Sequence, residues 1–299
     1  MVHREKKVGD SVQIVSTILC FFLYTYVIVA AIYFGVSFYT YCLAKKENHT
    51  NTYEWVREYL SPVAEIMNAF ALFLFVGLIA FSTSLVGNKM TLFILGAIIF
   101  MLLGIRIGNM VFWNKKLVEG YTGLCIPGLL AAIVTNIEHE YYQLHFWLII
   151  ILTIVSVLYI SATFLTYCAY KRKDRNAILL FRKWALFWSV QTMIVIGAIA
   201  IVMNGFEIVG WQKMMETWWV FIVSFAGFLG ATHYLFHQHH YQLAILFAFI
   251  NLLFAFFGQE TLMFVFQTFS SFGNIFIFGM LICMLAFYLQ QFFYIQKQK

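Results

Sequence analysis

The chain has 299 residues, of which 63% are apolar and only 11% are charged, and its mean hydropathy is +0.83. A soluble domain holds about 45–50% apolar and about 25% charged residues, so this composition excludes an ordinary soluble enzyme, a disordered chain and a nucleic-acid-binding module. The formal net charge of +6 comes from too few charges to make a basic face. We therefore expect it to mark the cytoplasmic loops of a membrane protein.

Long apolar segments follow one another along the chain. The first, near residues 11–44, is too long and too late for a signal peptide. As a helix it would be about 51 Å long, against a hydrocarbon core of ~30 Å, so it tilts or projects from the bilayer. Because barrel strands would alternate in polarity, we expect an all-α integral membrane protein with about nine transmembrane helices packed as bundles. The further spans are expected at 59–84, 89–113, 121–137, 142–170, 183–204, 216–236, 241–258 and 269–294.

The connections between these spans are short, so we expect one polytopic membrane domain over residues 1–299. Nine spans place the two termini on opposite sides of the membrane. If the C-terminus is cytoplasmic, most of the 19 lysines and arginines lie on the cytoplasmic side, which the positive-inside rule favours. The basic residues Arg4, Lys6 and Lys7 of the N-terminal tail argue for the opposite orientation.

Acidic residues inside an expected span are the first candidates for chemistry, because a buried charge is costly in a bilayer. Glu65 lies three residues after Pro62, in the first turns of the second span. A carboxyl group there relays protons if water reaches it, or simply complements the helix dipole at headgroup depth. Glu207 and Glu260 lie at expected span ends, where solvation is the simpler interpretation.

Four histidines form a second candidate cluster at the cytoplasmic end of an expected span. His233 and His237 are four residues apart and so share a helix face, a spacing that suits a metal. No nearby cysteine or carboxylate completes a site, so a solvated loop is the preferred interpretation. None of the four lies far enough inside a span to serve as a haem ligand. The cluster comprises His233, His237, His239 and His240.

Three other features have structural interpretations. The five cysteines are expected to pack as small hydrophobic residues rather than to pair. The abundant aromatic residues are expected to contact lipid and to form interfacial belts. Gly104 and Gly108, spaced as GxxxG, predict a close helix approach.

Two short motifs resemble those of a known family. One contains Pro62, Glu65, Asn68 and Phe70, and the other is the segment 123–128, Gly-Leu-Cys-Ile-Pro-Gly. Both resemble helix openings in subunit II of cytochrome bd-type quinol oxidases, and the chain's only two prolines lie in them. The likeness continues more loosely at Tyr33–Val36, Arg106 and Lys171–Lys183.

The chain also departs from the family pattern. Tyr33 stands where the family has an acid in its first helix, and no acid follows the third-helix arginine near Val111. Gly128 replaces the second residue of a Pro-Pro pair. These differences indicate a divergent or specialised member.

The resemblance implies a non-haem subunit II of a terminal quinol oxidase in a bacterial cytoplasmic membrane, with the N-terminus outside and the C-terminus cytoplasmic. The partner subunit I would carry haem b, either as two b-type haems or as a b-type pair with haem d, and quinol would be the substrate of the complex. This chain would bind no cofactor or metal and would support assembly and access of protons and oxygen. By position, Glu65 and Asn68 would belong to the proton pathway and Phe70 to the oxygen entry.

Two alternatives stay open at this stage. The chain could be a transporter or channel for a small solute, although its prolines are expected at helix starts rather than in mid-span. It could also be a structural membrane protein without a redox role.

Overall fold

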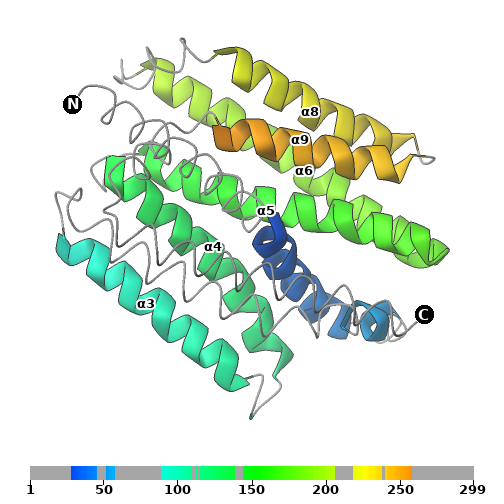
Figure 1. Ribbon diagram of the computed structural model, residues 1–299, viewed down its shortest axis with the longest axis horizontal. Coiled ribbons are helices and arrows are strands. Elements are labelled where there is room, and N and C mark those ends of the chain that lie inside the picture. The colour runs from blue at the N-terminus through cyan, green and yellow to red at the C-terminus, as the bar shows by residue number, and fades with distance from the viewer. Residues whose placement is uncertain are drawn as a thin grey trace, which may run out of the picture. The chain divides into compact units, whose positions relative to one another are not determined.

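The computed structural model describes residues 28–45, 52–57, 89–109, 112, 115–138, 144–205, 218–237 and 240–257. These residues belong to one compact unit, Ile28–Gly258, and their regular structure is entirely helical (Figure 1). A helix over Ile28–Ala44 and a short helix over 52–57 precede the labelled helices. The labelled helices are α3 (Lys89–Gly108), α4 (Lys116–Glu138), α5 (Leu144–Lys171), α6 (Arg175–Gly205), α8 (Trp218–Phe236) and α9 (Tyr241–Phe257).

The all-α class is confirmed, and each labelled helix overlaps a span expected between 89 and 258, although α6 begins at Arg175 rather than at 183 and α4 at Lys116 rather than at 121. Two segments, Phe146–Lys171 and Arg175–Val202, are long and apolar enough to cross a bilayer, and four shorter apolar helices accompany them. The spans expected at 59–84 and 269–294 fall outside the described residues. The count of nine helices and the single domain over 1–299 therefore stay predictions.

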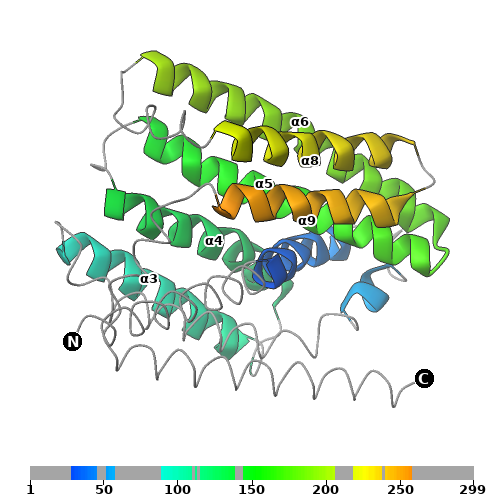
Figure 2. The same ribbon diagram turned by 45° about the horizontal axis from the view of Figure 1, so that its top comes forward.

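Helix α5 lies at the centre of this unit. It forms antiparallel hairpins with α4 and α6, and it also packs against α9, while α8 and α9 form a further hairpin (Figures 1 and 2). The Ser161 hydroxyl donates to the Ala31 carbonyl at 3.1 Å, and the Tyr39 hydroxyl donates to the Leu158 carbonyl at 2.8 Å. Helix Ile28–Ala44 is thereby tied to the middle of α5.

Close helix contacts occur at glycines other than those expected. A Cβ on Gly35 would collide with the Ser161 side chain and would lie 2.9 Å from the Val157 carbonyl oxygen. A Cβ on Gly123 would lie 2.6 Å from the Phe34 carbonyl oxygen. By contrast, no described atom lies within 4 Å of a Cβ placed on Gly104 or Gly108. The described helices therefore do not approach the GxxxG face of α3 closely, and a close helix approach there stays a prediction.

Pro127 also differs from its expected position. It lies in the interior of α4, not at its start, because the helix begins at Lys116. Proline cannot donate the usual hydrogen bond to the carbonyl four residues earlier, which is that of Gly123. The helix nevertheless continues to Glu138.

The C-terminal ends of α3, α5 and α8 and the N-terminal ends of α4, α6 and α9 lie at the same end of the unit (Figures 1 and 2). We call this the basic end, because most of the described lysines and arginines are found there. It includes Lys45, Arg57, Lys115, Lys116, Lys171, Arg172, Lys173, Arg175, Arg182 and Lys183.

Candidate functional site: a buried arginine between three helices

The sequence-predicted site residues Glu65, Asn68 and Phe70 lie outside the described residues. Their roles in proton and oxygen access therefore stay predictions. The described residues instead bring together a polar cluster around Arg106, a residue at which the sequence continues its looser likeness to the family pattern.

Arg106 is 2% exposed and lies near the C-terminal end of α3. Its Nη2 donates to the Ser37 hydroxyl at 2.6 Å, and its Nε donates to the Tyr33 hydroxyl at 3.3 Å. Its Nη1 donates to the Thr122 hydroxyl and to the Glu119 backbone carbonyl, both at 3.0 Å. One guanidinium thus joins helix Ile28–Ala44, α3 and α4, and we call these five residues the Arg106 cluster.

Aromatic rings complete the surroundings of the guanidinium. Its carbon lies 4.7 Å from the ring centroid of Tyr33 and 5.3 Å from that of Phe34. A cation is attracted to the faces of such rings, and more strongly where water is excluded. The hydrogen-bond acceptors and the rings that contact the Arg106 guanidinium among the described residues are all uncharged.

The neutral partners are themselves held by the backbone. Ser37 donates to the Tyr33 carbonyl at 2.9 Å, and Thr122 donates to the Val118 carbonyl at 2.7 Å. Their hydroxyl oxygens are thereby turned toward Arg106 as acceptors. An arginine keeps its charge in proteins, so the cluster holds a fixed positive charge between these helices.

Next to this cluster in the chain, Asn109 at the end of α3 is hydrogen-bonded to Lys115 just before α4. The Asn109 amide donates to the Lys115 carbonyl at 3.1 Å, and its side-chain oxygen accepts from the Lys115 N–H at 2.9 Å. Sequence reasoning singled out Arg106 and Tyr33 but missed Ser37, Asn109 and Thr122. Ordinary polar residues of this kind carry no local signal, because their partner comes from a distant part of the chain.

The histidines do not form a metal site in the described part of the chain. His233 and His237 are both exposed, and their ring centroids lie 4.2 Å apart at the end of α8. No group of three potential ligands occurs among the described residues, and His239 lies outside them. His240 has a structural role, since its carbonyl accepts from Leu243 and Ala244 at the start of α9.

Comparisons with known proteins agree with the resemblance seen in the motifs. No family model matches the chain. A Bacillus subtilis (strain 168) protein named "Putative cytochrome bd menaquinol oxidase subunit II" is 24% identical over 249 residues, which cover 75% of this chain and 71% of that protein.

A solved structure has the same fold. A chain of the bd oxidase from Geobacillus thermodenitrificans matches with a TM-score of 0.75 and 24% sequence identity, and the match covers 96% of this chain and 98% of that one. Both comparisons thereby agree with the resemblance that the sequence motifs indicated: the chain is similar in sequence to a protein named as a cytochrome bd menaquinol oxidase subunit II, and it shares the fold of a bd oxidase chain.

Proposed function

We propose that this chain is the non-haem subunit II of a cytochrome bd-like terminal quinol oxidase. It pairs with a haem-bearing subunit I in a bacterial cytoplasmic membrane, and the complex oxidises quinol and reduces oxygen. The observation that carries the proposal is the relative named as a menaquinol oxidase subunit II, which aligns over three-quarters of the chain. The shared fold with a bd oxidase chain supports it.

The proposed contribution of this chain is physical rather than covalent. Oxygen reduction in the partner consumes protons, and a carboxyl group at Glu65 would deliver them from the cytoplasmic side, with Asn68 in the same pathway. A carboxyl group in a low dielectric stays neutral and can exchange protons with nearby water. Phe70 would lie beside the route by which oxygen enters from the membrane.

The surroundings of Arg106 are unsuited to proton transfer, which supports a proton route in another part of the chain. At Tyr33 and near Val111 the chain lacks the two acids that the family pattern has. The described surroundings of Arg106 hold a fixed positive charge among neutral groups. A fixed arginine charge raises the electrostatic barrier to protons, so the region between helix Ile28–Ala44, α3 and α4 would not conduct them.

The distribution of basic residues supports an orientation for the subunit. The basic end would face the cytoplasm according to the positive-inside rule. With nine spans, the N-terminus would lie outside and the C-terminus in the cytoplasm.

Co-purification tests the oxidase assignment. The full-length chain is expressed with the gene product encoded beside it, and the isolated complex is examined by reduced-minus-oxidised haem spectra and by quinol-driven oxygen consumption. We expect both signals. A haem-free preparation that takes up a solute would support a transporter instead, and a preparation with neither signal would support a structural protein.

Substitutions at Glu65 test the proton pathway separately. We expect Glu65→Gln to slow quinol-driven oxygen consumption by at least tenfold, within the range that proton transfer contributes, while the haem spectra stay intact. Glu65→Asp should be the milder change. Glu207→Gln, at an expected span end, is the control that should leave turnover unchanged. Normal turnover in an assembled Glu65→Gln complex would exclude the proton role without affecting the oxidase assignment.

A further inference from the structure

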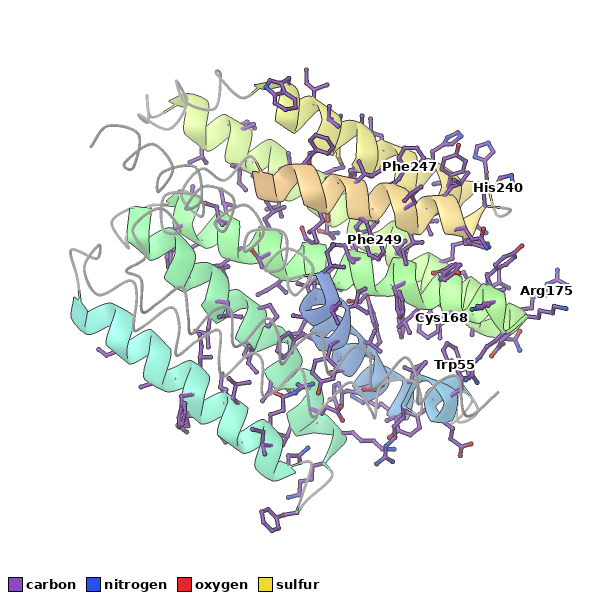
Figure 3. The ribbon with its side chains drawn as sticks, viewed as in Figure 1. Trp55, Cys168, Arg175, His240, Phe247 and Phe249 are labelled. Atoms are coloured by element: carbon purple, nitrogen blue, oxygen red, sulfur yellow. The ribbon has the colours of Figure 1, made fainter. Side chains whose placement is uncertain are left out.

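The α5–α6 turn presents an unusual group of exposed cations beside a buried tryptophan. Lys171, Arg172, Lys173 and Arg175 are all exposed, and Figure 3 shows Arg175 extending from the tip of the hairpin. Asp174, the acid among them, is occupied locally, because its carboxylate accepts from the Ala177 N–H at 3.1 Å at the start of α6. Since four cations face one carboxylate in this turn, the turn keeps a net positive charge.

Trp55 belongs to the short helix 52–57, and its ring packs against this end of the hairpin (Figure 3). It is only 6% exposed. Its ring makes an edge contact with Phe181 of α6 at 6.1 Å between centroids, and the Arg172 guanidinium carbon lies 5.2 Å from the ring centroid, over its face. Arg172 is thus held against the indole while its charge stays open to solvent.

The indole Nε1 of Trp55 is a buried donor that has no acceptor within the described residues. A buried donor without a partner costs about 1–3 kcal/mol, so such groups are rare in proteins and call for an explanation. Here one cation, Arg172, lies over the face of the same ring, and three more exposed cations follow or precede it in the turn, which points to an anionic acceptor.

The position of the turn indicates where that anion comes from. The turn joins Phe146–Lys171 and Arg175–Val202, the two segments long and apolar enough to cross a bilayer. A short turn between two such segments lies at the depth of the lipid headgroups, where phosphates are present and where tryptophan is enriched. Clusters of lysine and arginine directly beyond a transmembrane helix bind anionic headgroups.

We propose that Trp55 and the cations Lys171, Arg172, Lys173 and Arg175 form a binding site for the phosphate of an anionic phospholipid. Arg172 and its neighbours attract the headgroup, and the Trp55 N–H donates to a phosphate oxygen. The chain itself covers this N–H, so the headgroup reaches it after neighbouring side chains shift. The proposal requires a membrane location but not the oxidase role.

The test uses the purified full-length chain in detergent, titrated with dioleoylphosphatidylglycerol and, separately, with dioleoylphosphatidylcholine. Binding is followed by native mass spectrometry. We compare the triple variant R172Q/K173Q/R175Q with the control K45Q/K115Q/K183Q, which removes the same number of exposed charges from the same end. The conservative variant Trp55→Phe removes the N–H and keeps an aromatic ring.

We expect the wild-type chain to prefer phosphatidylglycerol. Because R172Q/K173Q/R175Q removes charged donors that would contact the phosphate directly, it should bind at least tenfold more weakly. The control keeps those contacts and should bind less than twofold more weakly. Trp55→Phe, the variant least prone to misfold, should also weaken the preference measurably.

Three results would overturn the proposal. An equal loss in both triple variants would mean that only overall charge matters. Competition by inorganic phosphate at millimolar concentration would indicate a site for the free anion rather than for a lipid. Unchanged phosphatidylglycerol binding by R172Q/K173Q/R175Q, with loss of a co-purifying subunit, would identify the turn as a protein interface.

Discussion

At the scale of single residues, the main feature is a buried cation with neutral described partners. Taking a charge out of water costs several kcal/mol unless hydrogen bonds replace the water. Arg106 recovers part of this cost through Ser37, Tyr33, Thr122 and the Glu119 carbonyl. Arginine suits the position because its planar group presents five donors in a fixed fork.

Replacing Arg106 tests whether all the groups around its guanidinium are uncharged. Arg106→Lys keeps a buried charge but loses the fork, so we expect the free energy of unfolding to fall by about 2 kcal/mol. Arg106→Met removes the charge and leaves neutral groups, of which Ser37 and Thr122 still bond to backbone carbonyls. Its loss should therefore be no larger than that of the lysine variant. Both values come from titration with sodium dodecyl sulfate in mixed micelles.

The control for this pair is Lys183→Met, which removes an exposed charge and should change stability by less than about 0.5 kcal/mol. If Arg106→Met lost more than about 3 kcal/mol, a carboxylate left without its counter-charge would be indicated. That result would contradict the neutral cluster.

Glycine positions give a second residue-scale prediction. Gly35→Ala places a Cβ against the Ser161 side chain and the Val157 carbonyl, so helix Ile28–Ala44 and α5 must separate. We expect a loss of about 1–3 kcal/mol from overpacking, visible as a lower thermal midpoint. Gly104→Ala meets no described atom within 4 Å and should stabilise the protein by up to about 1 kcal/mol through helix propensity. Equal effects of the two substitutions would show that α5 does not approach Gly35 this closely.

Sequence reasoning reached some of these residues and not others. The sequence marks Arg106 and Tyr33 because each stands at a position of the family pattern. Their contact could not be predicted, because hydrogen bonds across 73 positions leave no local pattern. The same reason explains why the contact between Trp55 and Arg172 was missed.

At the scale of elements, the helix ends at the basic end are closed by specific side chains. Lys173 adopts a left-handed conformation with φ of 62°, which ends α5 and allows the Asp174 N–H to donate to the Ala169 carbonyl at 3.1 Å. Arg182 of α6 donates to the last carbonyls of α8, those of Leu235 at 2.8 Å and Phe236 at 3.0 Å. A cation there also complements the negative end of the helix dipole.

Removing this C-terminal cap should loosen the end of α8. We expect Arg182→Gln to increase amide hydrogen exchange over residues 233–237, because two carbonyls of the last turn lose a charged donor. The exchange in α5 should stay unchanged. Lys183→Gln, the neighbouring substitution of an exposed cation, is the control. An identical exchange profile for both variants would mean that Arg182 does not hold the helix end.

The elements themselves were largely predictable, because apolar runs of this length have few other solutions in a bilayer. The expected spans at 142–170, 216–236 and 241–258 differ from α5, α8 and α9 by at most two residues at an end. The position of Pro127 was not predictable in this way. Proline favours the first turn of a helix, yet polar residues from Lys116 onward extend α4 beyond the apolar run that marked it.

At the scale of the whole molecule, the described unit combines an apolar exterior with one charged end. Exposed apolar residues on α3, α6 and α8, among them Met101, Ile194 and Ile222, suit contact with lipid chains. The ends of the described helices place most of the described basic residues at one end (Figure 1). The linear sequence predicted this common side from the charge bias, and the antiparallel order of the helices agrees with it.

The orientation of that end in the membrane can be measured by cysteine accessibility. In a functional background whose native cysteines are replaced, single cysteines are introduced at Lys115 and Lys173 of the basic end and at Leu144, which is exposed at the start of α5. A membrane-impermeant maleimide is then applied to intact and to permeabilised cells. Because lysine and arginine accumulate on the cytoplasmic side, we expect positions 115 and 173 to react only after permeabilisation and position 144 to react in intact cells. The reverse pattern would invert the subunit, and Glu65 would then no longer be placed to take protons from the cytoplasm. Reaction of all three positions in intact cells would show that the hairpin α5–α6 does not cross the bilayer as its length and composition predict.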